Sequence, residues 1–241
     1  MMIGPRNRQE DCIFDGITVF QTDLLLRKNG FTTSHLLLTV CDGMGGHAAG
    51  ETASLYLCEQ LGRIDWRNLI STDSIRDALA DIQQASMEHL PANSGTTIAG
   101  LLVGEEKTIA FNAGDSRTYR LRPESIEYLS HDHTRVQEMV DQALVDNARA
   151  SRHPMKNLIE FGIGPVFERA WPIRQVYLNE APIESPAWYL LCSDGLTDVM
   201  PDKKIHELLM PDPIENGNRL YNALKRKGLK DNTSFIIAEI R

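Results

Sequence analysis

Residues 35–51 read HLLLTVCDGMGGHAAGE, and they begin with a continuous apolar run, His35–Cys41, that stops at Asp42-Gly43. A short apolar run bounded by a turn signal is typical of a buried β-strand. The carboxylate of Asp42 is therefore expected at the end of a rigid strand, from which it reaches out of the core. Other aspartates stand in the same relation to strand patterns: Asp115 follows Thr108–Ala113, Asp194 follows Trp188–Cys192, and Asp231 precedes Ser234–Ile240.

The remaining patterns predict more strands and a smaller number of helices. Thr96–Val103 and Thr108–Ala113 flank a four-residue turn and predict a hairpin, and Arg117–Leu121 continues as a strand. Helical spacing of apolar residues is found in these segments: Gly50–Leu61, Ile75–Leu90 with Asp73 or Ser74 as N-cap, Arg135–Arg149 and Gly217–Lys227. Because strands and helices are grouped rather than alternating, the sequence predicts an α+β fold with largely antiparallel sheets.

Length and composition limit the classes of protein. The 241 residues fit one domain, residues 1–241, with 42% hydrophobic and 24% charged residues. A formal net charge of −8 argues against nucleic acid as a partner, because binding a phosphate backbone needs a basic face. No stretch approaches the roughly 18 apolar residues of a membrane span, so no membrane insertion is expected. The first residues lack an apolar signal sequence, and the cytoplasm is the expected location.

Cysteine usage excludes one kind of metal site. The four cysteines are scattered, without a C-x-x-C pair, and are expected to be free thiols rather than zinc ligands: Cys12, Cys41, Cys58 and Cys192. The aspartates indicate another kind. Buried unpaired charge is too costly to keep, so a cluster of carboxylates at strand ends requires metal cations or cationic partners, and hard oxygen ligands select Mg²⁺ or Mn²⁺. For any single Asp-Gly pair the alternative is an ordinary turn.

Six short motifs carry a resemblance to a known family. They are Gly4–Asp11 (GPRNRQED), Val40–Glu51 with its DGMGGH core, Ser94–Thr97 (SGTT), Asn112–Arg117 (NAGDSR), Cys192–Asp198 (CSDGLTD) and Asp231–Ser234 (DNTS). In this order they resemble the PPM family, the PP2C-type metal-dependent serine/threonine protein phosphatases, and specifically its bacterial branch. The resemblance spans residues 4–234, and Gln9 departs from the asparagine usual at its place.

The resemblance implies a fold and a set of roles. The fold is a central sandwich of two antiparallel sheets with helices on both outer faces, and the implied cofactors are two Mn²⁺ or Mg²⁺ ions with a third, weaker one. The residues implied to hold the ions are Asp42 as the bridge, the Gly43 carbonyl, Asp194 and Asp231 at the first ion, Glu10 and Asp11 through water at the second, and Asp115 with Asp194 at the third. Arg6 would bind the substrate phosphate through its planar guanidinium.

The expected reaction is hydrolysis by direct attack of a metal-bridging hydroxide on phosphorus, without a phosphoenzyme. Met44 stands where animal members carry a histidine. His47 follows nearby, and both a proton-transfer role and a structural one stay open for it. Ser193 lacks a triad context and is interpreted as structural, as are His131 and His133. Residues 132–174 are expected to form a flap subdomain that influences substrate choice.

The sequence therefore predicts a monomeric, metal-dependent serine/threonine phosphatase that reverses a bacterial Ser/Thr kinase on phosphorylated proteins. One alternative is a catalytically inactive module of the same family that only binds phosphoproteins, although every metal aspartate is present. A second alternative is a metal-dependent phosphoesterase that acts on small molecules or nucleic acid, of which the negative charge disfavours the latter.

Overall fold

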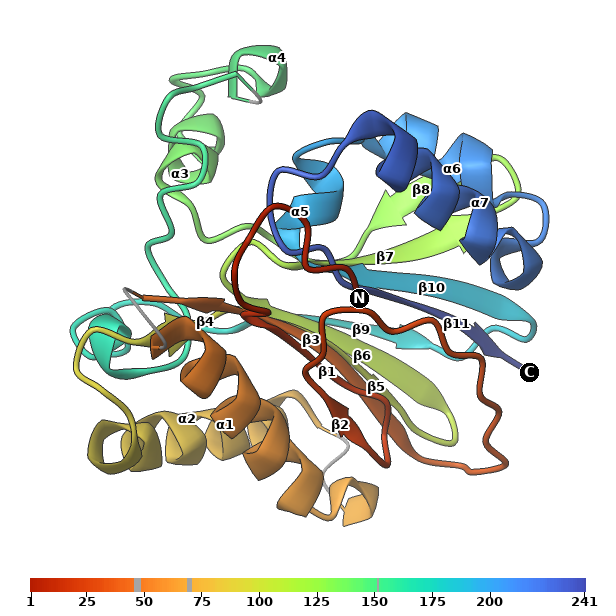
Figure 1. Cartoon of the computed structure of the whole chain (residues 1–241). Helices are drawn as coiled ribbons and strands as arrows, with labels where there is room; N and C mark the ends of the chain where they lie inside the picture. Colours follow the sequence, from red (N-terminus) through yellow and green to blue (C-terminus); the bar gives the residue numbers. More distant parts are fainter. Residues whose placement is uncertain (46–48, 69–70, 151) are drawn as a thin grey trace.

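Two antiparallel β-sheets face each other in the computed structural model, which describes residues 1–241 apart from 46–48, 69–70 and 151 (Figure 1). The larger sheet has the strand order β2-β1-β3-β5-β6-β9, and β4 pairs with β3 at the end of that strand. Its strands are β1 (Asp11–Phe14), β2 (Val19–Phe20), β3 (Leu36–Met44), β4 (Gly95–Thr96), β5 (Ile98–Val103), β6 (Lys107–Ala113) and β9 (Tyr177–Pro182).

The smaller sheet has the order β11-β10-β7-β8. Its strands are β7 (Arg117–Arg122), β8 (Ser125–Tyr128), β10 (Ala187–Cys192) and β11 (Phe235–Ile240). The chain crosses from one sheet to the other through the Gly114-Asp115 turn between β6 and β7. Strands β8 and β9, which are mostly polar or half-exposed, had no clear signal in the sequence.

Helices cover the outer faces of both sheets (Figure 1). The two long helices α1 (Ala49–Arg63) and α2 (Thr72–His89) lie on the larger sheet, and the short 3₁₀ helix η1 (Trp66–Asn68) connects them. Helices α6 (Asp202–Leu209) and α7 (Pro213–Lys227) lie on the smaller sheet. The one-turn helix α5 (Asp194–Thr197) follows β10 directly. This arrangement confirms the expected α+β sandwich flanked by helices. Within the described ranges, no helix has the length and apolar character needed to cross a membrane.

Three hydrophobic clusters hold the four layers together. The first lies between the larger sheet and α1 and α2, with Leu57, Leu79 and Phe111 fully buried. The second lies between the smaller sheet and α6 and α7 around Tyr119. The third lies between the two sheets, where Val40 meets Tyr189 and Leu191 of the facing sheet. Apolar residues on both faces of β3 and β10 explain why both strands appear in the sequence as continuous apolar runs.

Two local expectations differ from the structure. The N-cap of α2 is Ser71, whose side chain accepts a hydrogen bond from the Ser74 amide at 3.0 Å, so the expected N-cap at Asp73 or Ser74 is wrong. Ser74 completes a capping box by bonding back to the Ser71 amide. The expected helix Arg135–Arg149 divides into α3 (Arg135–Asp141) and α4 (Asn147–Ala150), because the chain turns at Ala143 with a φ of 56°.

The segment expected to form a flap projects from the body of the molecule with α3 and α4 at its tip (Figure 1). It returns through η2 (Pro165–Phe167) to the larger sheet. The returning chain bridges Thr96 through Ile163, and apart from α3, α4 and η2 the described residues of the segment have little regular structure. Its base therefore lies beside the strand ends that carry the aspartates.

Candidate active site

Four aspartates converge where strands of the two sheets end. Asp42 lies in β3 rather than beyond its end, and Asp11 of β1 is its direct partner in the antiparallel register. Asp194 is the first residue of α5, and Asp115 occupies the turn between β6 and β7. Electrostatic interactions join Asp42 to Asp11, Asp194 and Asp115. Residues separated by more than 180 positions in the sequence thus form one acidic cluster.

Burial and mutual repulsion raise the pKa of these carboxyls. Desolvation raises the pKa of Asp42 and of Asp115 well above the ordinary value, and neighbouring aspartates raise both further. Burial raises the pKa of Asp11 to about 7 and that of Asp194 to about 6. Without a cation, the cluster therefore retains protons close to neutral pH. Cations would favour the charged forms of all four carboxylates.

The contacts of these carboxylates provide a test of whether metal ions fit. Among the described residues, Asp11 Oδ1 and Asp115 Oδ1 are buried without a hydrogen-bond partner. In the part of the chain that the structure describes, no three His, Cys, Asp or Glu side chains are close enough together to hold one metal ion. Asp194 instead hydrogen-bonds to Asp42, and Arg6 pairs with Asp231. The donor chemistry and the orphaned oxygens fit hard divalent cations, provided that these two contacts open.

Arg6 is held by one of the aspartates predicted to bind metal. Its guanidinium donates to Asp231 Oδ2, and this hydrogen bond raises the Arg6 pKa. Glu10 and Asp42 lie near enough to add to that shift. The Arg6 side chain is 51% exposed and that of Asp231 is 34% exposed, so the pair lies at the mouth of the cluster. The Arg6 guanidinium therefore lies on the solvent-facing side of the aspartates.

Asn232 holds the segment that carries Arg6. Its side chain accepts from the Glu10 amide at 2.8 Å and donates to the carbonyl oxygens of Ile3 and Arg8 at 2.7 and 3.1 Å. These bonds close a loop around Arg6. The DNTS motif thus has two tasks, since Asp231 interacts electrostatically with Asp11 and Asp194 of the acidic cluster, while Asn232 fixes the N-terminal loop beside it.

Close backbone contacts fix Asp42 and Gly43. A Cβ on Gly43 would lie 2.1 Å from the carbonyl oxygen of Gly50 at the start of α1, so no larger residue fits there. The Asp42 amide donates to Thr97 Oγ1 at 3.1 Å, and the Asp42 carbonyl accepts from the Thr97 amide at 2.8 Å. Thr97 Oγ1 in turn contacts Ser116 Oγ at 2.6 Å. The SGTT and GDSR motifs thereby hold the DGMGG strand in place.

Two serines orient Asp11. Ser193 Oγ donates to Asp11 Oδ2 at 2.8 Å, and the Ser234 amide donates to Ser193 Oγ at 3.0 Å. Both serines are fully buried. These contacts agree with the interpretation of Ser193 as a structural residue. The sequence did not show, however, that Ser193 holds the carboxylate of Asp11. Its position beside Asp194 was the available signal.

The remaining predicted residues are also placed. The backbone carbonyl of Glu10 accepts hydrogen bonds from the Gly43 amide at 3.1 Å and from Ser54 Oγ at 2.5 Å. Burial raises the pKa of the Glu10 carboxyl. His133 contacts the backbone of Gly114 and of Gln175, which favours a structural role. His131 bonds to Asp141 at 2.9 Å. His47 lies outside the described residues.

Two groups of residues near the site were not predicted from the sequence. Arg117 donates to both carboxylate oxygens of Asp132, at 3.0 Å from Nε to Oδ1 and 2.5 Å from Nη2 to Oδ2, and this pair lies beside Asp115. On the flap, Lys156 pairs with Asp198 Oδ1, and Asn157 donates to Asp198 Oδ2 at 3.1 Å. Asp198 is the last residue of the CSDGLTD motif, so the flap contacts the chain four residues after Asp194.

Comparison with known proteins places this geometry in context. No family model matches the chain. A serine/threonine protein phosphatase, PstP, of Mycobacterium tuberculosis is 32% identical over 218 residues, which cover 85% of this chain and 40% of that protein. The protein phosphatase PhpP of Streptococcus pneumoniae is 30% identical over 186 residues, 73% of each chain. The chain belongs to the bacterial PP2C-type serine/threonine protein phosphatase family.

The solved structures agree with this family assignment. The catalytic domain of PstP in complex with two manganese ions is 28% identical, with a TM-score of 0.73 over 98% of this chain and 94% of that one. The match spans less than half of the mycobacterial phosphatase. The shared sandwich does establish that the expected fold is the family's fold.

Proposed function

We propose that the chain hydrolyses phosphoserine and phosphothreonine in proteins, using two divalent cations held by the acidic cluster. The observation that carries this proposal is the convergence of Asp11, Asp42, Asp115 and Asp194 with raised pKa values and two orphaned oxygens. Family membership and the manganese-bound PstP relative support it. The presence of every metal aspartate disfavours the inactive binding module.

The residues that would hold the two ions are Asp42, the Gly43 carbonyl, Asp194 and Asp231, with Glu10 and Asp11 acting through water. When bound, such ions supply an activated water and neutralise phosphate charge. Mn²⁺ is favoured by the relative, while Mg²⁺ fits the same oxygen donors. A third, weaker ion would be held by Asp115 and Asp194, and the unpartnered Asp115 Oδ1 supports its placement there.

Arg6 would bind the substrate phosphate. In the structure its guanidinium pairs with Asp231, and an ion at Asp231 would compete with that pair. The released guanidinium would then offer two parallel N–H donors to phosphate oxygens, a geometry that a lysine cannot supply. Arg6 thus has a carboxylate partner without substrate and a phosphate partner with it.

The chain's own groups also fix the site's geometry. Ser193 holds Asp11, Thr97 holds the backbone of Asp42, and the Arg117–Asp132 pair supports the turn that carries Asp115. The flap, anchored to Asp198, would contribute to substrate choice. Phosphoproteins made by a Ser/Thr kinase are the proposed substrates, and a monomeric state and a cytoplasmic location stay predictions of the sequence.

Phosphopeptide hydrolysis by the purified protein tests this function. Phosphate release from a phosphothreonine peptide should require added Mn²⁺ or Mg²⁺ and should stop after exhaustive treatment with EDTA. Restoring the ion should restore the rate, which separates metal loss from unfolding. Full turnover after chelation would contradict the two-ion proposal. Binding of phosphopeptide without any release at saturating Mn²⁺ would instead favour the inactive module.

A further inference from the structure

Positive charge gathers at the end of α7 that leads toward the active site. The chain from 216 to 230 contains five Lys or Arg residues and no Asp or Glu, although the formal net charge of the protein is −8. The last four of the five are exposed and form a surface that we call the basic patch: Lys225, Arg226, Lys227 and Lys230. The first three of these lie in the final turn of the helix, and Lys230 lies beyond it.

The cations of the basic patch lack carboxylate partners within the protein. No Asp or Glu of the described ranges pairs with them, because the carboxylates of Glu215 on α7 and Glu207 on α6 pair instead with Lys28 and Lys204. The helix dipole favours cations in the last turn, but its effect ends there and does not account for Lys230. The patch therefore presents positive charge to solvent that nothing in the described chain neutralises.

The basic patch ends beside the mouth of the acidic cluster. Lys230 directly precedes Asp231, the carboxylate that pairs with Arg6. Leu229 lies against the N-terminal loop, since a Cβ added to Gly4 would lie 3.2 Å from the Leu229 Cβ. In Figure 1 the chain leaves α7 and passes α5 and the N-terminal loop before it enters β11. The patch thus begins on α7 and ends on a loop that touches the loop of Arg6.

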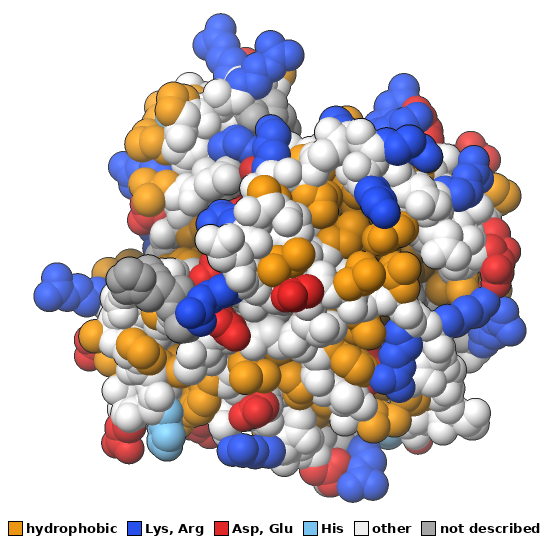
Figure 2. Space-filling view, in the orientation of Figure 1, with side chains coloured by type: hydrophobic (Ala, Val, Ile, Leu, Met, Phe, Trp, Pro, Cys, Tyr) orange, Lys and Arg blue, Asp and Glu red, His pale blue; other side chains and the backbone are white. Residues whose placement is uncertain are grey.

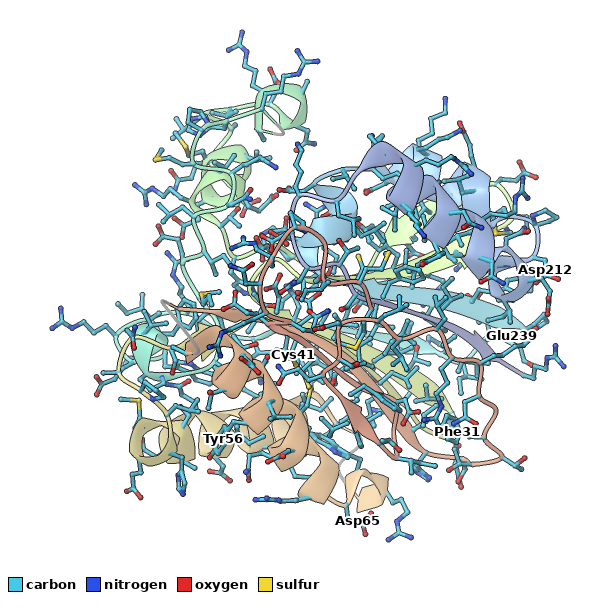
Figure 3. The ribbon with its side chains drawn as sticks, in the orientation of Figure 1. Phe31, Cys41, Tyr56, Asp65, Asp212 and Glu239 are labelled. Atoms are coloured by element: carbon cyan, nitrogen blue, oxygen red, sulfur yellow. The ribbon has the colours of Figure 1, made fainter. Side chains whose placement is uncertain are left out.

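The acidic residues of this segment lie at the other end of α7. Asp212 caps the helix by accepting a hydrogen bond from the Glu215 amide at 3.1 Å. The 15 residues of α7 span about 22 Å, and Asp212, labelled in Figure 3, lies at the end away from α5. Figure 2 shows Lys and Arg side chains over α6 and α7. The charge of α7 is therefore divided, with its unpaired cations at the end near the active site.

We propose that the basic patch binds an acidic segment of the phosphoprotein substrate, close to the residue whose phosphate meets Arg6. This inference rests on the proposed function, because it names the class of substrate that the same site would prefer. Asp and Glu side chains, or a second phosphorylated residue, would supply the negative charge that the patch lacks within the protein. The patch would then act on substrate choice and not on the chemical step.

The reach of a short peptide agrees with this arrangement. Lys227 lies four residues before Asp231, and four residues of chain span at most about 14 Å. An extended substrate covers that span with about four residues, since each advances by about 3.3 Å. Acidic residues within a few positions of the phosphorylated residue would therefore lie over the basic patch while the phosphate lies at Arg6.

The surroundings favour a peptide over a larger polyanion. A nucleic acid or an anionic membrane binds through a broad basic face. Here the basic patch borders a cluster of buried aspartates, and the whole chain has a net charge of −8. A peptide can place its acidic residues on the patch alone, whereas an extended phosphate backbone or a lipid surface would also face the acidic residues around it.

Steady-state kinetics with two matched peptides test the inference. The acidic peptide is Glu-Glu-Glu-Gly-Ala-pThr-Ala-Gly-Glu-Glu-Glu, and the neutral peptide carries Gln in place of every Glu. At saturating Mn²⁺ and low ionic strength, kcat/KM should be at least about five-fold higher for the acidic peptide, through a lower KM. In about 0.5 M NaCl the preference should fall below about two-fold, because salt screens exposed charges. Equal values for both peptides at low ionic strength would overturn the inference.

A triple variant locates the effect. Three exposed charges are removed in Lys225→Gln/Arg226→Gln/Lys227→Gln, which should reduce the preference for the acidic peptide to below about two-fold. Hydrolysis of p-nitrophenyl phosphate, which is too small to reach the patch, should stay unchanged. The matched control removes the same charge at exposed positions outside α7 and should keep the preference: Arg63→Gln/Arg67→Gln/Arg241→Gln. An unchanged preference in the first variant, or an equal loss in the control, would refute the patch.

A binding measurement separates this inference from the proposed function. If the protein hydrolyses no phosphopeptide at saturating Mn²⁺, the proposed phosphatase activity fails, and fluorescence anisotropy with the labelled acidic peptide still tests the patch. The unchanged protein should bind this peptide at least about five-fold more tightly than the triple variant does. Phosphatidylserine vesicles and a single-stranded RNA serve as other polyanions. If the triple variant loses binding to either of them while the two peptides behave alike, the patch serves that polyanion and the substrate inference is wrong.

Discussion

The acidic cluster and the flap meet at α5, yet they are held in different ways. Asp194, at the start of α5, belongs to a buried group whose carboxylates repel one another and are fixed by strand ends and buried hydroxyls. Asp198, at its end, is reached by Lys156 and Asn157 of the flap through partly exposed side chains. A cation would favour the charged forms of the clustered carboxyls, whereas the flap contact is a partly exposed pair that water can replace.

This difference predicts that substitutions in the acidic cluster and substitutions at the flap contact have different consequences. Substitutions within the cluster should have large effects, because Asp11 and Asp115 are buried and desolvation raises the pKa of all four carboxyls. Contacts at the flap can vary with modest effect, since exposed pairs contribute little. Substitutions on the two sides should therefore differ strongly in size and in the kinetic parameter that they change.

The largest effect is expected for Asp194→Asn. Loss of a ligand shared by the proposed ions should lower kcat by at least about 100-fold, above the effect of changing a group that only orients a ligand. The melting temperature of the metal-free protein should stay the same or rise, because one repelling carboxylate is gone. Steady-state kinetics with Mn²⁺ and thermal melts measure both. A marked drop in the melting temperature of the metal-free variant would show that Asp194 acts structurally.

Arg6→Ala should come next. Removing a charged donor to phosphate costs about 1.5–3 kcal/mol, which corresponds to roughly 10–160-fold in kcat/KM. Arg6→Lys should recover only part of this loss, because an ammonium cannot make the two-pronged contact. The measurement is kcat and KM on a phosphopeptide for both variants. Kinetics identical to those of the unchanged protein would place Arg6 in a solvated loop without contact to substrate.

Lys156→Ala tests the flap side. The Lys156 side chain is 34% exposed, so its loss should change KM for phosphopeptides by only a few-fold and leave kcat nearly unchanged. The matched control is Lys204→Ala, which removes an exposed pair on α6 far from the flap. If Lys156→Ala instead lowers kcat as strongly as Asp194→Asn, the flap contact is part of the chemistry and the contrast between the two sides fails.

The smallest effect concerns pH and stability. The pKa of Asp11 is about 7 and that of Asp194 about 6 in the folded chain, against an ordinary value of 3.8, so the folded state binds more protons than the unfolded state between about pH 4 and 7. Stability of the metal-free protein should therefore fall as pH rises through this window. Melting temperatures should drop by several degrees between pH 5.5 and 7.5. Saturating Mn²⁺ should reduce that drop, and a rise with pH in EDTA would contradict the cluster.

Local pattern was sufficient for much of the sandwich. Strands β3, β5, β6, β10 and β11 lie close to their predicted ranges because long apolar runs bounded by turns have few alternatives. Strands β8 and β9 were missed, since half-exposed edge strands lack such runs. The N-cap of α2 was misplaced because several serines and aspartates in a row can cap a helix, and the side-chain bond that selects Ser71 is not visible in composition.

For the site, the sequence by itself predicted Asp42, Asp115, Asp194 and Asp231 as metal ligands, since each follows or precedes a strong strand pattern within a recognisable motif. It also named Arg6, but not its pairing with Asp231. Only the tertiary structure decided that Ser193 serves Asp11, that Lys156 reaches Asp198, and that Cys41 lies beside Cys12 in the register while Cys58 contacts both. The physical reason is that these contacts join residues distant in the chain, and sheet pairing, not local propensity, brings them together.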